Sequence, residues 1–305
     1  MTATGDLPWL TPLQAKLSAL AEQQQLAHAL LLTGMPGVGK TQLAKALTAF
    51  LLCKMPAHGH ACGQCKSCLL LAANNHPDWL ALAADNSSIG VDEIRRIIEF
   101  TQGTAQQHGN RVISLPRAER MTESAANALL KTLEEPPQGC YLVLQSSQPQ
   151  RLKATLLSRC QRWDIAPLTK SALQQWLATQ VSEPIPEFIY RYSGGAPLAA
   201  LSLLTSAESA QIEQVLRQLT EVLQTPADLA AVVKVLESRT DSSHILGYFI
   251  CELLLSTHSL SAERQLRLQQ RYYRWCRDEQ QILGQNKTLA LTALLQEVKT
   301  LVVAR

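Results

Sequence analysis

A chain of 305 residues is long enough for two or three domains. Its net charge of +3 is small for this length, which argues against a protein that coats nucleic acid. It has no run of about 18 apolar residues, and residues 1–17 lack the basic flank and apolar run of a signal peptide. We therefore expect no membrane span and no signal peptide, and predict a cytoplasmic protein.

The chain begins with leucines at helical spacing over residues 13–26, followed by an apolar run of strand length at 29–33. The stretch Gly34-Met-Pro-Gly-Val-Gly-Lys-Thr41 then fits G-x-x-x-x-G-K-[ST], the phosphate-binding P-loop, and residues 42–52 again have helical spacing. A strand before the motif and a helix after it are the context that a P-loop requires. An ordinary glycine turn is the alternative. The residues expected to bind nucleotide are Gly34, Pro36, Gly37, Gly39, Lys40 and Thr41.

The chemistry of this stretch suits a nucleoside phosphate. The glycines let the backbone curl and turn its N–H groups inward, and the positive end of the following helix attracts phosphate. Lys40 is expected to reach the terminal phosphates, and the hydroxyl of Thr41 can hold Mg²⁺. ATP or ADP with Mg²⁺ is the expected ligand.

Eight cysteines are unevenly distributed, and four of them fall between residues 53 and 68. A disulfide framework is unusual in a cytosolic chain of this size, so these four are interpreted as metal ligands: Cys53, Cys62, Cys65 and Cys68. Four thiolates suit a tetrahedral zinc ion with no open position, which indicates a structural site. An iron–sulfur cluster and unliganded thiols are the alternatives. Three nearby histidines are expected to be solvated loop residues: His58, His60 and His76.

Strand-like and helix-like segments alternate after the cysteines. Strands are predicted at 77–82, 111–115, 141–145 and 161–165, and helices at 91–100, 122–135 and 152–159. This alternation favours an α/β fold, a parallel sheet with helices on both faces. Pro167 marks a boundary. Residues 168–205 are predicted to form small helices, and the rest of the chain a bundle of about five helices.

The strand predicted at 111–115 is where a hydrolysing P-loop protein needs an acid, which holds the magnesium and orients the attacking water. The strand is followed by Pro116 and Arg117, and the nearest acid, Glu119, lies beyond the proline. We therefore expect a nucleotide cradle without the catalytic acid.

The helical region from residue 206 onward contains eleven Lys and Arg and eleven Asp and Glu. From this balance we infer that the bundle has no basic stripe. Direct DNA binding by the bundle is then not indicated.

Two further stretches carry a family resemblance: Asn127-Ala-Leu-Leu-Lys-Thr-Leu-Glu-Glu-Pro-Pro137 and Ser158-Arg-Cys160. Together with the P-loop and the four cysteines, they resemble the bacterial clamp-loader branch of the AAA+ family. The resemblance covers residues 1 to about 205 well and the bundle weakly. It implies an AAA+ P-loop domain at 1–167 with a zinc module at 53–68, a small helical lid domain at 168–206, and a helical oligomerisation (collar) domain at 207–305.

Within that family, the hydrolysing gamma/tau branch has Asp-Glu where this chain has Pro116 and Arg117. It also has a phosphate-sensing arginine where the stretch Gly195-Ala-Pro-Leu198 places a leucine. Both differences favour a resemblance to the non-hydrolysing delta-prime branch. The intact P-loop departs from several delta-prime relatives, so nucleotide binding without turnover is expected.

The resemblance implies that Arg159 is an arginine finger, which projects into the nucleotide site of a neighbouring ATPase subunit. It implies partners of the gamma/tau and delta types, and contact with the sliding clamp and primed DNA through the complex. We expect no ATPase activity of its own, although the complex would belong to a DNA-directed DNA polymerase holoenzyme. From local spacing alone, Arg159 is equally a surface arginine paired with an acid. The roles of Lys131, Glu134 and Glu135, and of Ser146 and Ser147 at the family's first sensor position, are left open.

Two other functions remain open at the level of sequence. One is a self-sufficient ATPase of the gamma/tau type, with Glu119 or another acid in catalysis. The other is a zinc-bearing module that binds nucleic acid.

Overall fold

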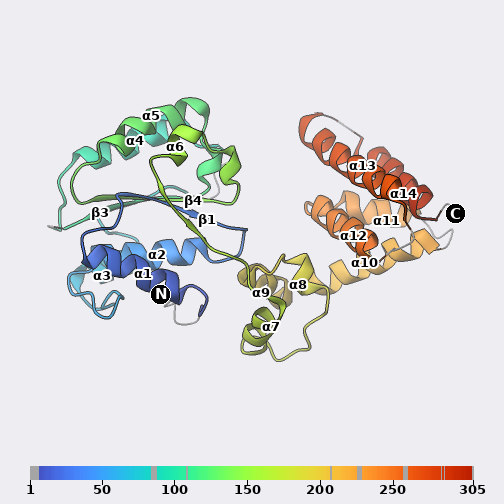
Figure 1. Ribbon diagram of the computed structural model, residues 1–305, viewed down its shortest axis with the longest axis horizontal. Coiled ribbons are helices and arrows are strands. Elements are labelled where there is room, and N and C mark those ends of the chain that lie inside the picture. The colour runs from blue at the N-terminus through green and yellow to red at the C-terminus, as the bar shows by residue number, and fades with distance from the viewer. Residues whose placement is uncertain are drawn as a thin grey trace. The chain divides into compact units, whose positions relative to one another are not determined.

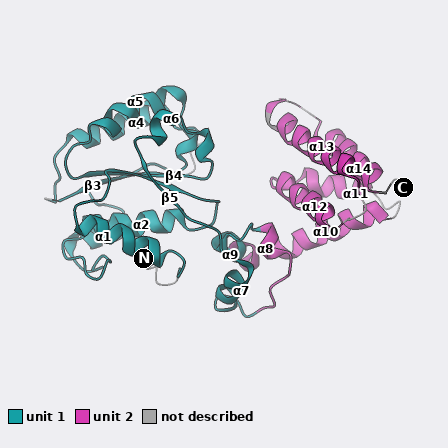
Figure 2. Ribbon diagram, viewed as in Figure 1, with its two compact units in different colours: residues 1–182, 193–201 teal, residues 183–192, 202–305 magenta. Residues whose placement is uncertain are grey.

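The computed structural model describes residues 7–83, 88–107, 109–206, 208–224, 229–256, 260–282, 284 and 286–303. The chain divides into two compact units (Figure 2): residues 1–182 with 193–201, and residues 183–192 with 202–305. The first unit contains the β-sheet and the second the helical bundle. The three-part division expected from the sequence, with boundaries at 167 and 206, stays a prediction.

The first unit is built on a five-stranded sheet with the order β2-β3-β4-β1-β5, and all its strand pairs are parallel. The strands are β1 (Ala29–Thr33), β2 (Trp79–Ala81), β3 (Arg111–Leu115), β4 (Cys140–Ser146) and β5 (Gln161–Asp164). The α/β class and all five strands are as predicted. The edge strand β2 is shorter than expected, and the side chain of Asp78 just before it accepts hydrogen bonds from the backbone N–H groups of Gln106 and Gln107.

Helices cover both faces of the sheet (Figure 1). One face carries α1 (Thr11–Glu22), α2 (Lys40–Leu52) and α3 (Lys66–Ala72). The other carries α4 (Val91–Gln102), α5 (Glu123–Glu134) and α6 (Ala154–Leu157). Every residue of β1 and β3 is buried, because a parallel sheet covered on both sides needs apolar residues on both faces of its central strands. On the α4–α5 side, Ile94 and Ile97 pack with Leu129 and Leu133 in one continuous core.

Three short helices follow the sheet: α7 (Lys170–Ala178), α8 (Ile189–Tyr192) and α9 (Pro197–Thr205). Residues of α7 and most of α9 belong to the first unit.

The N-terminal segment also supports the P-loop. The indole N–H of Trp9 donates a hydrogen bond to Val38 O at 2.8 Å, and its ring lies edge-on to Trp176 of α7 at 4.9 Å between centroids.

The second unit is a bundle whose described part has the five helices expected from the sequence: α10 (Glu208–Gln224), α11 (Leu229–Glu237), α12 (Ser242–Ser256), α13 (Ala262–Gln281) and α14 (Lys287–Val303). Its core draws on all five, with Leu219, Leu236, Ile245, Leu268 and Leu291 almost fully buried. Among the helices of the described residues, none is long and apolar enough to cross a lipid bilayer.

Candidate functional site

The P-loop lies between the end of β1 and the start of α2, as its motif predicts. Gly37 and Gly39 have φ angles of +82° and +101°, a region that favours glycine. The space around Gly37 is equally restrictive, since a Cβ there would lie 2.6 Å from the Cβ of Ala199 on α9. The carbonyl oxygen of Gly37 also accepts a hydrogen bond from the N–H of Leu198 at 2.9 Å. The position that the resemblance compares with a phosphate-sensing arginine is therefore in direct backbone contact with the P-loop.

The Lys40 side chain is turned onto the P-loop itself. Its ammonium group donates to Gly34 O at 2.7 Å and to Met35 O at 2.9 Å. Burial lowers the pKa of Lys40 to about 8, and the negative charge of Glu119 acts in the opposite direction. The two carbonyl oxygens are neutral acceptors. A bound phosphate would offer the Lys40 ammonium group a charged acceptor and therefore a stronger hydrogen bond.

Thr41 is held by a neutral partner. Its hydroxyl donates to the amide oxygen of Gln145 at 3.0 Å, and Gln145 is a buried residue near the end of β4. The sequence analysis missed this contact. A polar residue late in an otherwise apolar buried strand is the signal that could have identified Gln145, because the carboxyl ends of neighbouring parallel strands meet at one edge of the sheet.

Pro116 and Arg117 follow β3, so no acid stands directly at its end. The carboxylate of Glu119, a little further along the chain, acts on the P-loop lysine. Arg117 has a left-handed conformation with φ of 49°, and the turn Ala118–Arg120 that follows reverses the chain. Oε1 of Glu119 then accepts from the backbone N–H of Ser147 at 3.3 Å, while its Oε2 is buried without a hydrogen-bond partner among the described residues. Glu119 also raises the pKa of Lys40, against the larger effect of burial. The expectation of a nucleotide cradle without the catalytic acid stays a prediction, although the charge of Glu119 acts on Lys40.

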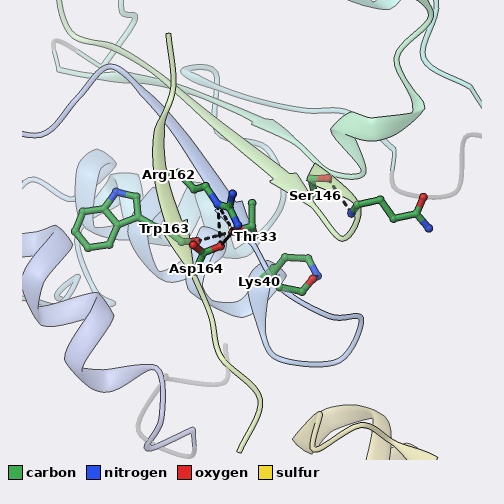
Figure 3. A network of polar contacts seen from close by, with 8 residues as sticks. Thr33, Lys40, Ser146, Arg162, Trp163 and Asp164 are labelled. Carbon is green, nitrogen blue, oxygen red and sulfur yellow. Dashed lines mark hydrogen bonds and ion pairs between the residues drawn. The ribbon is translucent and has the colours of Figure 1, made fainter. Parts of the chain in front are cut away.

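A second acid near the strand ends, Asp164, is bonded through one of its carboxylate oxygens (Figure 3). Oδ1 of Asp164 accepts from the hydroxyl of Thr33 and from Nε and Nη2 of Arg162 at 2.9 and 2.8 Å. Burial acts to raise the pKa of Asp164, but the hydrogen bonds from Thr33 and Arg162 outweigh it and lower the pKa. In the same view the hydroxyl of Ser146, at the family's first sensor position, accepts from Gln148 N at 3.1 Å. Asp164 therefore stays ionised at neutral pH as the partner of Arg162.

Arg159 lies just after α6, at the surface of the first unit. Its Nη1 donates to Thr155 O at 2.8 Å, and its Nη2 forms an ion pair with Glu134 at the end of α5. The Arg159 side chain is 33% exposed and that of Glu134 46% exposed. The structure thus brings together the two stretches that carried the family resemblance. Ion pairs at this exposure contribute about 1 kcal/mol or less, so Glu134 can hold Arg159 in place and still release it.

The four clustered cysteines converge at the C-terminal end of α2. Their Sγ atoms all lie within 4.8 Å of one another, and two of the pairs, Cys53–Cys65 and Cys62–Cys68, are 4.0 Å apart. Four thiolates about 2.3 Å from a tetrahedral zinc ion are separated by about 3.8 Å, so this arrangement fits zinc closely. Backbone N–H groups of Cys62, Cys65 and Cys68 donate to sulfur atoms within the cluster.

Those donors favour the thiolate form that a metal requires. Burial acts to raise the pKa of Cys65, but backbone N–H groups of Lys54 and Cys68 outweigh it and lower the pKa to about 6. Backbone N–H groups also lower the pKa of Cys62, whereas burial raises the pKa of Cys53 and of Cys68. The prediction that His76 is a solvated loop residue is wrong. His76 is buried, with its ring bonded to Ser67 at 2.6 Å and to the N–H of Asp78 at 3.0 Å, whereas His58 and His60 are exposed as expected.

Comparisons with known proteins agree with this geometry. Residues 10–169 match a family model described as "DNA polymerase III, delta subunit". The chain is 44% identical over 206 residues to DNA polymerase III subunit delta' of Yersinia pestis, an alignment that covers 65% of this chain and 61% of that protein. It is 42% identical over 222 residues to the Pseudomonas aeruginosa protein of the same name, with 71% and 66% covered. The chain belongs to the DNA polymerase III delta-prime family.

The aligned region spans about two thirds or less of the length of these delta-prime relatives. A solved structure of a DNA polymerase III gamma subunit-related protein from Thermotoga maritima shares the fold at a TM-score of 0.51 and 17% identity, covering 93% of this chain and 97% of that one. This delta-prime family member therefore shares the fold of that gamma subunit-related protein and carries a four-cysteine cluster in its first unit.

Proposed function

We propose that this chain is a non-hydrolysing subunit of the replicative DNA polymerase clamp loader, acting in the bacterial cytoplasm. Its partners would be gamma/tau-type ATPase subunits and a delta-type subunit, with the sliding clamp and primed DNA reached through the complex. Family membership supports the assembly. The end of β3, where Pro116 and Arg117 replace the acidic pair of hydrolysing relatives, is the observation that carries the non-hydrolysing assignment.

Arg159 would serve a neighbouring subunit. A guanidinium placed against a terminal phosphate stabilises the charge of the transition state, and such a group is worth about 10³–10⁵ in rate. Three features of Arg159 support this role: its position after α6, its partial exposure, and an exposed partner, Glu134, that phosphate can replace.

The test is an ATPase assay of the clamp loader reconstituted with gamma-type subunits. Arg159→Ala should lower the stimulated rate by about 100-fold or more at each site it serves, and Arg159→Lys should restore little, since a lysine cannot form the planar two-point contact. Arg151→Ala is the matched control, because Arg151 is an exposed arginine nearby that bonds to Gln148. An Arg159→Ala complex that assembles and hydrolyses ATP at the normal rate would refute the finger.

The cofactors follow from the two ends of α2. The loop residues Gly34, Pro36, Gly37, Gly39, Lys40 and Thr41 would bind ATP or ADP with Mg²⁺ without hydrolysing it.

The four cysteines would hold a structural zinc ion, which would fix the loop 53–68 to α2 and α3. Elemental analysis should find one zinc per chain, and Cys65→Ser should release it. A full complement of zinc in that variant would exclude this site.

Glu119 favours a second candidate, hydrolysis by the chain itself. Two observations support this candidate: Oε2 of Glu119 is buried with no hydrogen-bond partner among the described residues, and the charge of Glu119 acts on Lys40. A carboxylate of this kind can orient an attacking water. ATP turnover by the isolated chain that is lost in both Lys40→Ala and Glu119→Gln would establish this function and end the first proposal. Turnover at background level in the parent and in both variants supports the first.

A further inference from the structure

The balanced charge of the bundle hides a separation between its helices. Helices α13 and α14 together carry seven Lys and Arg against four Asp and Glu, a net charge of +3. Helices α10 and α11 carry two against four, a net charge of −2. The inference that the bundle has no basic stripe is therefore wrong, because it rested on a total over the whole region.

The positive charge is concentrated on one side of α13. Its five arginines recur every three or four residues, so they fall within an arc of about 140° and extend along about 20 Å of the helix. They are Arg264, Arg267, Arg271, Arg274 and Arg277. The buried Leu268 and Trp275 lie along one edge of this arc, and Tyr272 anchors the helix by donating to Ser243 O on α12 at 2.8 Å. Helix α13 packs against α12 and α14 (Figure 1), and all of its arginines except Arg264 are exposed.

The four exposed arginines, Arg267, Arg271, Arg274 and Arg277, are held only weakly. Arg267 pairs with Glu263 at 2.7 Å and Arg271 with Glu297 of α14 at 3.1 Å, and the arginine side chains are 63% and 48% exposed. Arg277 is 61% exposed and lies 3.8 Å from Asp278. Arg274 is exposed and has no ion-pair partner among the described residues. Exposed pairs of this kind contribute about 1 kcal/mol or less, so phosphate oxygens can replace the carboxylates at little cost.

An exposed aromatic side chain accompanies the arginines. Tyr273 is 68% exposed and follows the anchoring Tyr272 directly, so the two rings point to different sides of α13. Leu266 lies on the same side of the helix as Tyr273 and is 55% exposed. Arginines alternating with an exposed aromatic ring are the combination by which proteins hold single-stranded nucleic acid, with guanidinium groups on the phosphates and the ring stacked on a base.

We propose that this arginine face of α13 binds the backbone of single-stranded DNA. Arginine suits this task better than lysine, because its planar guanidinium can donate two hydrogen bonds to one phosphate. Tyr273 supplies the stacking surface. The site is separate from the P-loop and from Arg159, so it adds a DNA contact that does not depend on the proposed function of either.

The test measures binding of a fluorescein-labelled dT20 oligonucleotide to the full chain by anisotropy, over a range of salt concentrations. Arg274→Gln with Arg277→Gln should weaken binding about tenfold or more at low salt. The same pair should flatten the slope of log K against log salt by about 1.4, since each contact to a single strand contributes about 0.7. Tyr273→Ala should weaken binding about fivefold, while Tyr273→Phe should not.

The matched control removes two exposed positive charges from the acidic side of the bundle, with Arg217→Gln and Lys234→Gln. It should bind dT20 as the parent does, and Arg274→Lys with Arg277→Lys should retain most of the binding. Equal losses in the control and in the α13 variant would overturn the proposal, as would an absence of dT20 binding at low salt. Displacement by poly-glutamate at the same charge concentration, with no effect of Tyr273→Ala, would assign the face to an acidic protein instead and also overturn it.

Discussion

The ends of β1 and β3 lie at the same edge of one sheet with β4 between them, yet they carry different parts of a nucleotide site. After β1 the chain retains every feature of a P-loop: the glycines with positive φ, Lys40 and Thr41. After β3 it has Pro116, and then Arg117 in a left-handed conformation. The comparison teaches that the residues for holding phosphate and those for activating water can be separated, because they come from different strands.

The contacts of the two ends reinforce this difference. Thr41 is bonded to the neutral amide of Gln145 and not to a carboxylate. Glu119 approaches from a turn beyond β3, and one of its oxygens is already bonded to the backbone of Ser147. Substitutions at either strand end can measure how complete the separation is.

Lys40→Ala should weaken nucleotide binding by about 100-fold, because charge-assisted hydrogen bonds to phosphate are worth about 1.5–3 kcal/mol. Titration of the isolated chain with a fluorescent ATP analogue and Mg²⁺ measures the change. Lys45→Ala is the control, since Lys45 is an exposed lysine on the same helix. Equal affinities of the Lys40 and Lys45 variants would show that the loop does not hold the terminal phosphates.

Restoring an acidic pair after β3 tests the other side of the comparison. Pro116→Asp with Arg117→Glu should raise the ATPase rate of the isolated chain about thirtyfold above the parent, because it returns a carboxylate to the strand that faces the P-loop. The same double change combined with Lys40→Ala should be inactive. If the restored chain binds ATP normally but remains at background, then the loss of turnover has a cause other than these two positions.

The pH dependence of nucleotide affinity should report the state of Lys40. Its pKa of about 8 lies below the usual value for lysine, and a bound phosphate would raise it. Affinity should therefore be constant below pH 8 and fall about tenfold per pH unit above it, as a proton must be taken up to bind. In Glu119→Gln the fall should begin at lower pH, because Glu119 raises the pKa of Lys40. A flat profile up to pH 9.5 would contradict this account.

The sequence predicted the strands well because their burial leaves a strong local signal. The apolar runs at 29–33 and 111–115 are central strands covered on both faces, and the P-loop glycines are required by the local backbone. The position of Glu119 could not be predicted in the same way. It depends on the left-handed Arg117, and a single non-glycine residue in that conformation leaves no clear pattern in a sequence.

Contacts between distant parts of the chain were also beyond local reasoning. The bond from Thr41 to Gln145 and the burial of His76 against Ser67 arise only when separate elements pack together. The arginines of α13 were visible in the sequence but were averaged with the acids of other helices. Charge therefore has to be counted on each helix face, because a partner meets a face and not a composition.

The hydrogen bond between Gly37 and Leu198 has a mechanical consequence. With Ala199 directly against the loop, nothing larger than a hydrogen atom fits at position 37 without displacing one of the two segments. Any shift of the loop on admitting a ligand must therefore carry the start of α9 with it or break that bond. Binding of a ligand to the P-loop is in this way coupled to the position of α9, through the backbone of that helix.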